Sequence, residues 1–525
     1  MTTASGIPVW REFGHSPAPA SATEHRRIVI VGAGPVGLTL ALDLARRGQD
    51  VLVLNRLSFI AAGSKAICFA KRSLEIWDRL GVAEAMIDKG VVWNVGKVFW
   101  GDRSDPIYQF DLLPDQRQRL PAFINIQQYH VEERLVAALA DYPNVELRWG
   151  HGVVGVEQQP DGALLSVSSE AGDYDVECDW LIACDGCKST VRESLGFDFD
   201  GRIFEDNFLI ADVRMKGEFP TERWFWFDPP FNRNQSALLH KQPDDIWRLD
   251  FQLGWDIDRE ASVQPENVEP LIRGLLGPDV AFEQEWYSVY TFQCRRMSRF
   301  VHGRVIFAGD SAHVVSPFGA RGCNGGLADA ANLGWKLDLV IRGEASTALI
   351  ESYNEEAIIA ADENIRHSSR ATDFMSPKTA AGRTLRDAVL ELANDHDWAR
   401  GFVNSGRLST AVDYRESALN TADTDDGWHG LAPGTPASDA LLASGSLLQQ
   451  LGEGFTLIGY HAPAALGLPL VEVGDGDDVA IDRYDLKPGT VYLVRPDHYV
   501  AARWRRVTRE TIETAVATAS CPARQ

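Results

Sequence analysis

The chain has 525 residues, of which 45% are hydrophobic and 24% charged, and its formal net charge is −23. The length predicts two or three domains, and the composition is typical of a globular protein in water. So acidic a surface repels nucleic acid and anionic membranes, which we therefore exclude as partners. The apolar runs also stop short of the roughly 18 residues that a membrane span needs, so we expect no membrane association.

Residues 1–24 lack the basic start and the apolar run of a secretory signal, so we expect a mobile N-terminal extension. The seven cysteines are an odd number spread thinly along the chain, which does not resemble a disulfide framework and indicates the reducing cytoplasm. Cys184 and Cys187 form a CxxC pair, but no second pair lies at zinc spacing. We therefore predict no metal site and no redox role for these thiols.

A short buried strand at 27–31 leads into the loop GAGPVG, and a helical pattern and a second strand follow before residue 55. This order is that of a βαβ unit in a parallel sheet. Gly32 permits the tight turn, Gly34 lets the backbone approach a pyrophosphate, and Gly37 lets helix and strand pack closely. The sequence thus predicts a Rossmann-type dinucleotide site.

A carboxylate that accepts the ribose hydroxyls is expected at the end of the second strand. This chain has Asn55 there, followed by Arg56. An amide still hydrogen-bonds a hydroxyl but lacks the charge that strengthens the bond. Two interpretations stay open: Asn55 contacts the ribose directly, or the contact has moved to Arg56 or a neighbour.

The composition and the hydrophobic pattern of the sequence change in the middle of the chain. Segments rich in aromatic residues, partly in alternation, predict a mainly antiparallel β-sheet domain at 201–297. The Rossmann pattern then resumes with RVIFAGD and helical segments, so we predict a discontinuous first domain at 25–200 and 298–415. A linker rich in Asp, Thr, Gly and Pro at 416–439 leads to a small α/β module at 440–525.

Two later segments indicate which dinucleotide is bound. They are DWLIACDG at 179–186, followed by KSTVRESLG, and GRVIFAGDSAH at 303–313, followed by VVSPFGARGCNGGLADAANLGWKL. With the glycine loop they resemble the three ordered fingerprints of the group A flavoprotein monooxygenases, the aromatic hydroxylase family that includes phenol, p-hydroxybenzoate and 3-(3-hydroxyphenyl)propionate hydroxylases. The resemblance implies an α/β fold: a Rossmann-type FAD-binding domain, an inserted antiparallel substrate sheet of α+β type, a helical segment and a thioredoxin-like C-terminal module, here without a CxxC motif.

The third fingerprint has a physical rationale beside a flavin. Asp310 follows a strand, so it can accept hydrogen bonds from ribityl hydroxyls at the carboxyl edge of the sheet, and Gly309 leaves room for the cofactor. The glycine-rich stretch at 319–326 precedes a helix whose N-terminal amides can stabilise negative charge on the reduced flavin. By the resemblance, Pro317 lines the reactive edge of the flavin, Arg321 supports its reduced form, and Asn324 holds the ring beside Gly322.

The resemblance also implies roles for residues of the other segments. Asp185 and Gly186 match the family's DG pair, which helps to hold FAD and is linked to the use of reduced nicotinamide. Gln128 matches a flavin-contacting glutamine, with Gln127 as its near competitor. Lys65 stands where the family usually has an arginine that contacts the cofactor phosphates; lysine keeps the charge and loses the bidentate fork.

The inserted sheet supplies the candidate substrate residues. We predict Trp226, His240 and Tyr290 as pocket residues, because they can wall an aromatic ring and bind a phenol or a carboxylate. Trp224 and Phe225 point to opposite faces of one strand, so only one of the two can face the flavin. His240 is also our hypothetical general base for a phenol.

The family's cycle implies NAD(P)H as co-substrate: FAD is reduced, dioxygen gives a flavin C(4a)-hydroperoxide, and one oxygen atom passes to a small phenolic or other aromatic substrate. The alternatives are the same chemistry on a polycyclic or polyketide substrate, a non-oxygenating FAD dehydrogenase or halogenase, and a non-catalytic FAD-fold binding protein. The tryptophan motif and catalytic lysine of a halogenase are not found. We expect a cytoplasmic enzyme, and a homodimer is one oligomeric state that stays open.

Overall fold

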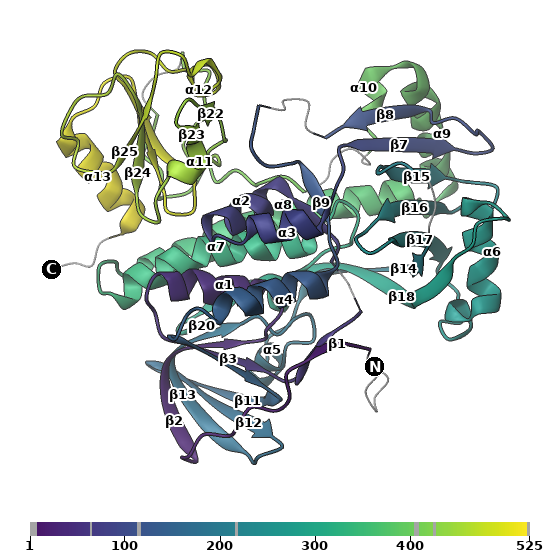
Figure 1. The fold of residues 1–525 in the computed structure, drawn as a ribbon, viewed down its shortest axis with the longest axis horizontal. Helices are drawn as coiled ribbons and strands as arrows, with labels where there is room; N and C mark the ends of the chain where they lie inside the picture. The colour runs from purple at the N-terminus through teal and green to yellow at the C-terminus, as the bar shows by residue number, and fades with distance from the viewer. Residues whose placement is uncertain are drawn as a thin grey trace.

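The computed structural model describes residues 8–63, 66–112, 117–215, 219–403, 409–423 and 427–521. Figure 1 shows one large sheet at the bottom and a second at the right, long helices between them, and a small sheet at the upper left that is formed by the end of the chain. In this part of the chain, no helix is both long and apolar enough to cross a membrane.

The first sheet contains the parallel strands that the glycine loop predicted. Its order is β10-β3-β2-β13-β12-β11, and β20 pairs in parallel with the second half of β13. Ile30 lies opposite Val53, and Ile182 opposite Ile306, in the centre of the hydrophobic core. The strands are β2 (Thr23–Val31), β3 (Val51–Asn55), β10 (Val145–Trp149), β11 (His151–Gln159), β12 (Gly162–Ser169), β13 (Tyr174–Ala183), β20 (Val305–Phe307) and β19 (Val301–His302), which pairs antiparallel with β20.

A layer of helices packs on this sheet and buries the apolar side of each helix in one shared core. Tyr353 fixes the layer to the sheet, because its Oη donates a hydrogen bond of 2.8 Å to the carbonyl oxygen of Phe307. The helices are α1 (Pro35–Arg46), α2 (Lys71–Arg79), α3 (Ala83–Lys89), α4 (Gln128–Leu139), α5 (Thr190–Ser194), α7 (Gly322–Ile341) and α8 (Ala348–Met375).

The described part of the N-terminal extension is not a mobile tail. Strand β1 (Val9–Glu12) pairs antiparallel with β4 (Phe59–Ala61), and β2 already begins at Thr23. The ring of Phe13 stacks on Trp149 with 4.3 Å between the ring centroids. These apolar contacts with residues far along the chain give the segment its order, and no local pattern at 8–24 indicates them.

The second sheet has the order β21-β18-β14-β17-β16-β15-β7-β8. It takes in β7 and β8, which lie in the range that the sequence analysis gave to the first domain; β7 is parallel to β15, with Val98 opposite Phe225. A pairing between strands so far apart in the chain has no local sequence signal, so the pattern of residues does not predict it. The strands are β7 (Val95–Trp100), β8 (Tyr108–Asp111), β14 (Asp200–Arg214), β15 (Arg223–Phe227), β16 (Ser236–Lys241), β17 (Ile246–Gly254), β18 (Glu283–Arg296) and β21 (His313–Val314).

The two faces of this sheet are covered differently. On the outer face, Leu249 and Phe251 pack against α6 (Pro265–Leu276). On the inner face, an aromatic core packs against Phe318 and against the end of α8, α9 (Ala380–Asp395) and α10 (Asp397–Arg400). We use "inner face" below for the side that carries Phe225, Leu238 and Phe208.

A small sheet of order β5-β9-β6 connects the helix layer with the second sheet. Its strands are β5 (Cys68–Ala70), β9 (Phe123–Asn125) and β6 (Val91–Val92). Asn125 donates from Nδ2 to the carbonyl oxygen of Lys241 on β16, at 2.8 Å. The small sheet therefore holds β5 against the inner face.

The end of the chain forms a four-stranded sheet of order β25-β24-β26-β27. Part of the predicted linker packs on it: Trp428 is buried, and Thr421 donates its backbone N–H to Ala501 at 2.9 Å. We call residues 409–423 and 427–521 the C-terminal module. Its elements are β22 (Leu441–Leu442), β23 (Gly445–Ser446), α11 (Leu447–Gln450), β24 (Thr456–Tyr460), β25 (Leu470–Val473), α12 (Asp478–Arg483), β26 (Thr490–Val494), β27 (Val500–Trp504) and α13 (Arg509–Ser520).

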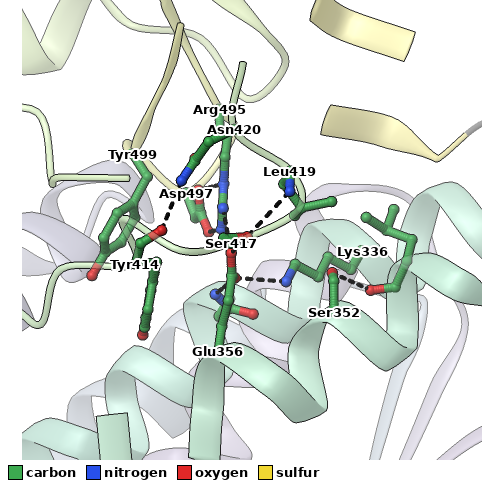
Figure 2. A network of polar contacts seen from close by, with 12 residues as sticks. Lys336, Ser352, Glu356, Tyr414, Ser417, Leu419, Asn420, Arg495, Asp497 and Tyr499 are labelled. Carbon is green, nitrogen blue, oxygen red and sulfur yellow. Dashed lines mark hydrogen bonds and ion pairs between the residues drawn. The ribbon is translucent and has the colours of Figure 1, made fainter. Parts of the chain in front are cut away.

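A buried network of charges joins this module to α7 and α8 (Figure 2). Glu356 accepts hydrogen bonds from both terminal nitrogens of Arg495, at 2.6 and 3.0 Å, and from Lys336 at 2.8 Å. Arg495 also pairs with Asp497 at 2.6 Å. Burial, opposed in part by Glu356, lowers the pKa of Lys336 to about 8. The module is thus tied to the helix layer by charges that each have a partner.

Candidate active site

Four turns that the sequence analysis singled out meet at the carboxyl edge of the parallel strands. They follow β2, β3, β13 and β20, at residues 32–37, 55–56, 185–186 and 309–310. Backbone hydrogen bonds tie them together: Gly32 donates to Leu54 at 2.8 Å, Cys184 to Val31 at 2.8 Å, and Ala308 to Ala183 at 3.0 Å. Ligands of open α/β sheets bind at this edge.

The glycine loop has the geometry of a phosphate cradle. Gly32 has φ +107°, and a Cβ there would lie 2.4 Å from the carbonyl oxygen of Cys184. A Cβ on Gly37 would lie 2.1 Å from the carbonyl oxygen of Gly32, whereas a Cβ on Gly34 would meet no atom of the described residues within 4 Å. No described side chain caps the N-terminus of α1 behind the loop. The open space at Gly34 and these helix amides fit the pyrophosphate of FAD.

Asn55 uses both polar atoms of its side chain on the backbone. Its Oδ1 accepts the N–H of Ala33 in the glycine loop at 3.1 Å, and its Nδ2 donates to Leu57 at 2.9 Å. Arg56 is exposed at the same edge. The amide of Asn55 thus fixes the shape of the glycine loop. A ribose contact made by Arg56 or a neighbour would leave both hydrogen bonds of Asn55 in place.

The turn after β13 is held by its own helix start. Asp185 accepts the N–H of Val191 through Oδ2 at 3.2 Å, while its Oδ1 is buried with no described partner. Burial raises the pKa of Asp185 above its ordinary value. Gly186 has φ +83° and open space around it. A buried carboxylate oxygen with an unmet acceptor position beside an open glycine fits a hydroxyl-bearing cofactor.

A buried ion pair supports the turn after β20. Asp329 of α7 accepts the N–H of Gly309 at 2.9 Å and a hydrogen bond from His313 Nε2 at 2.7 Å. Burial opposes the charge on His313, but Asp329 outweighs it and raises the pKa of the imidazole. Asp310 is exposed at the sheet edge. The sequence analysis missed His313 and Asp329, although His313 lies within the third fingerprint.

The loop at 317–321 leads into α7. Pro317 is exposed, and Gly319 and Ala320 both have positive φ, +97° and +52°. Arg321 is buried and donates from Nη1 to Asn364 Oδ1 at 2.9 Å. Gly322 begins α7, and none of the side chains that the structure describes caps the N-terminus of this helix. The positive end of a long helix and a buried guanidinium thus lie together.

Asn324 lies one turn into α7. Its Oδ1 accepts the N–H of Ala70 at 2.8 Å and the hydroxyl of Ser73 at 2.6 Å, and its Nδ2 donates to the carbonyl oxygen of Cys68 at 2.9 Å. The side chain thus joins α7 to β5 and α2. We predicted a contact between Asn324 and the flavin ring; these bonds make it a residue that positions the two segments.

The predicted glutamine contact lies on α4. Gln128 accepts the N–H of Ala66 through Oε1 at 3.2 Å and donates to Glu132 at 2.7 Å. Its competitor Gln127 is buried and donates to Pro243 at 3.1 Å, on the side of the second sheet. Gln128 therefore holds the segment that follows Lys65, and Lys65 itself lies outside the described residues.

The predicted substrate residues lie on both faces of the second sheet. Tyr290 is paired with Phe208 across the strands, on the inner face. The ring centroid of Phe208 lies 4.9 Å from that of Phe318, which follows Pro317 in the chain. Trp226 points to the outer face, where it stacks on Phe99 at 5.1 Å. Because side chains alternate along β15, Phe225 lies on the inner face, toward Phe318 and the loop before α7, whereas Trp224 and Trp226 lie on the outer face. We therefore leave Trp226 out of the proposed pocket.

His240 lies on the inner face and is a weak base. Its Nε2 is 3.2 Å from Asp250 Oδ2, and its Nδ1 is 3.9 Å from Cys68 Sγ. Burial, and secondarily the charge of Arg223, lower the pKa of His240 to about 4. An imidazole with so low a pKa accepts a phenol proton poorly. Sequence reasoning missed the partners Cys68, Arg223 and Asp250, because three separate segments bring them together.

Comparison with known proteins agrees with this geometry. A family model described as an FAD binding domain matches residues 25–368. The 12-dehydrotetracycline 5-monooxygenase/anhydrotetracycline 6-monooxygenase of Streptomyces rimosus subsp. rimosus is 31% identical over 504 residues, which cover 90% of this chain and 94% of that protein. The 3-(3-hydroxy-phenyl)propionate/3-hydroxycinnamic acid hydroxylase 2 of Burkholderia vietnamiensis is 28% identical over 517 residues, 91% of this chain and 93% of that protein.

A solved structure shows the same relationship over nearly the whole chain. The anhydrotetracycline hydroxylase OxyS from Streptomyces rimosus is 28% identical and superposes with a TM-score of 0.71, covering 95% of this chain and 100% of that one. The fold and the site define a flavoprotein monooxygenase. The chain belongs to the FAD-binding group A aromatic hydroxylase family, and it is an FAD-dependent enzyme that hydroxylates aromatic substrates. The predictions of family, enzyme class and FAD are confirmed.

Proposed function

We propose that the protein uses FAD, NAD(P)H and dioxygen to hydroxylate an aromatic ring that carries a hydroxyl group, with small phenols as the first candidate substrates. The observation that supports this proposal is the meeting of the two predicted sites. The aromatic inner face reaches the loop before α7. The ring centroid of Phe318 lies 4.9 Å from that of Phe208 and 5.5 Å from that of Phe292. An aromatic ring held there lies beside the turns that we assign to the flavin.

The residues at the sheet edge fit FAD. When bound, FAD supplies the redox chemistry, taking up electrons from NAD(P)H and delivering them to dioxygen. The amides of α1 and the open space at Gly34 would hold the pyrophosphate, and Asp310, exposed at the sheet edge, would accept hydrogen bonds from ribityl hydroxyls. Arg321 and the N-terminus of α7 provide positive potential where negative charge develops on the reduced ring.

The aromatic side chains of the inner face have a second task. Phe208, Phe292 and Phe318 are buried, and Phe318 packs edge to face on the other two rings, so they exclude water from the region beside the Pro317 loop. Exclusion of water strengthens hydrogen bonds and charges in the site and protects reactive oxygen species from side reactions. The chain thus orients the ring and keeps the reaction dry.

A polycyclic, polyketide-type substrate is the second candidate. Two relatives that cover at least nine-tenths of this chain differ in the substrates in their names: one acts on tetracycline precursors, the other on hydroxyphenyl acids. The tetracycline monooxygenase is the more similar in sequence, at 31% against 28%. A substrate panel therefore has to contain both ring sizes.

The test uses the purified, FAD-loaded enzyme. Oxidation of NADH and of NADPH is followed with phenol, resorcinol and 1-naphthol as single additions, and the products are separated and weighed by mass spectrometry. The proposal expects at least one hydroxyaromatic to stimulate oxidation and to gain 16 mass units. Oxidation that no aromatic compound stimulates, with no product formed, contradicts it and favours the dehydrogenase or the binding protein.

A further inference from the structure

A polar cluster lies on the inner face of the second sheet, between the aromatic core and the buried ion pair of Arg248 and Asp212. It consists of Cys68 on β5, Arg223 on β15, His240 on β16 and Asp250 on β17. Arg223 and His240 are direct neighbours across the strands, and Cys68 Sγ lies 3.9 Å from both Arg223 Nη1 and His240 Nδ1. The cluster is therefore continuous from β5 to β17.

Arg223 is a buried cation without a carboxylate of its own. Its side chain is 4% exposed and lies over two rings, 4.9 Å from the centroid of Phe225 and 5.8 Å from that of Trp93. Among the described residues, its Nε has no hydrogen-bond partner, and no carboxylate forms an ion pair with it. Stacking fixes the plane of the guanidinium, and an unmet buried donor costs stability unless a ligand accepts from it.

Asp250 carries the matching unmet acceptor. Its Oδ2 is bound by His240, while its Oδ1 is buried and has no hydrogen-bond partner among the described residues. The other charges nearby are already paired, because Arg248 and Asp212 form a buried ion pair at 2.8 Å. Within the part of the chain that the structure describes, the cluster thus contains one unmet donor on a cation and one unmet acceptor on an anion, and its net charge is balanced.

The cluster is adjacent to the proposed flavin turns. The backbone carbonyl of Cys68 accepts a hydrogen bond from Asn324, in the first turns of α7. Leu238 and Phe225, on the same face, belong to the aromatic core that contains Phe318. A ring that packs on this core can therefore direct a substituent toward Arg223 and Asp250.

We infer that Arg223 and Asp250 together recognise a hydroxyl group on the substrate ring, with Arg223 Nε donating to its oxygen and Asp250 Oδ1 accepting its hydrogen. The group recognised is a neutral phenol or enol. A carboxylate satisfies Arg223 but offers no hydrogen to Asp250, and it adds a second buried negative charge beside it. An ether accepts from Arg223 but leaves Asp250 unmet. The inference rests on the proposed function for the reaction, but its binding step stands by itself.

The experiment measures binding to the oxidised holoenzyme through changes in flavin absorbance, without NAD(P)H. The probes are two matched sets: phenol, anisole and benzoate, and 1-naphthol, 1-methoxynaphthalene and 1-naphthoate. In the wild type, the hydroxyl compound of at least one set binds about tenfold or more tighter than its ether and its acid, as expected for a hydrogen bond to a charged group. Arg223→Gln weakens the hydroxyl compound by about the same factor and reduces the difference from the ether.

Asp250→Asn is expected to raise the affinity for the acid while it lowers the affinity for the hydroxyl compound. A protein that is only destabilised does not bind the acid more tightly. Removal of the buried negative charge makes the acid bind tighter than it binds to the wild type, while the hydroxyl compound binds more weakly. Trp226→Phe, on the outer face, is the matched control and leaves all six affinities unchanged. FAD content and melting temperature are recorded for each variant.

The outcomes separate the two proposals. Equal affinities for hydroxyl, ether and acid in the wild type, or an acid that Asp250→Asn does not favour, overturn the inference even if hydroxylation occurs. Selective binding that depends on Arg223, without any hydroxylated product, overturns the proposed function and leaves the inference intact. Absence of both binding and product overturns both.

Discussion

Asn324 on α7 donates a hydrogen bond from Nδ2 to the backbone carbonyl oxygen of Cys68 on β5, at 2.9 Å. This bond is where the two halves of the proposed active site touch. On one side of it lies the helix whose N-terminus we assign to the flavin, and on the other lies the polar cluster that we assign to the substrate hydroxyl. The position of one site therefore constrains the other.

Replacement Asn324→Ala is expected to loosen both sites. The N–H of Ala70 and the carbonyl oxygen of Cys68 lose their partner in a buried region, at a cost of about 1–3 kcal/mol for each such group. Urea unfolding of the holoprotein measures the loss, and FAD titration of the apoprotein measures cofactor affinity. Unchanged stability and unchanged affinity contradict the positioning role.

The glycine loop offers a matched pair of substitutions. Gly32→Ala is expected to disrupt folding, because φ is +107° and the new Cβ would lie 2.4 Å from the carbonyl oxygen of Cys184. Gly34→Ala is expected to leave the fold intact, because its Cβ meets no atom of a described residue within 4 Å, and to weaken FAD binding by filling the space for the pyrophosphate. Circular dichroism and FAD titration distinguish the two effects. A Gly34→Ala protein that binds FAD normally argues against this cradle.

The flavin side of the site could be predicted from sequence because its signals are local. The glycine loop, Asp185 and Gly309 each begin within two residues of the end of a strand, and parallel strands end at one edge of a sheet. The family and the cofactor followed from these segments. The role of Asn55 did not, because its hydrogen bond to Ala33 depends on the folded shape of the loop.

The substrate side could be predicted only in part, because its signals are long-range. Alternation along β15 shows that Phe225 and Trp226 lie on opposite faces, but it does not show which face meets the flavin; we predicted Trp226 as a pocket residue, and the structure places it on the outer face beside Phe99. Cys68, Arg223 and Asp250 come from separate strands in two sheets. An unmet donor and an unmet acceptor become visible only when the packing is known.

The buried charges between the helix layer and the C-terminal module are expected to be essential for stability. Glu356→Gln leaves Arg495 and Lys336 with too few negative partners in a region closed to water, so the free energy of unfolding should fall by about 3–5 kcal/mol. Arg415→Gln, which removes an exposed pair with Asp413, is the control and should cost about 1 kcal/mol or less. Denaturant unfolding of both variants decides. Similar small effects contradict the role assigned to the network.

His240 predicts a pH dependence of stability. Its pKa is about 4 in the folded protein against an ordinary value of 6.5, so the unfolded chain binds a proton that the folded chain refuses. Above pH 6.5 the imidazole is neutral in both states and does not change the free energy of unfolding. As the pH falls from 6.5 to 4, the free energy of unfolding decreases by up to about 3 kcal/mol. Unfolding of the wild type and of His240→Asn is measured across this range. The variant should lose less stability, and parallel curves contradict the assignment.

The central claim is that this enzyme places one atom of dioxygen on a ring that already carries a hydroxyl group. The most direct test is a single-turnover reaction of the FAD-loaded enzyme with NAD(P)H and ¹⁸O₂, using the hydroxyaromatic compound that binds best. The account predicts one ¹⁸O atom in each product molecule and loss of the product in Arg223→Gln at the same substrate concentration. A product whose new oxygen comes from water, or hydroxylation of the matched ether at an equal rate, would contradict it.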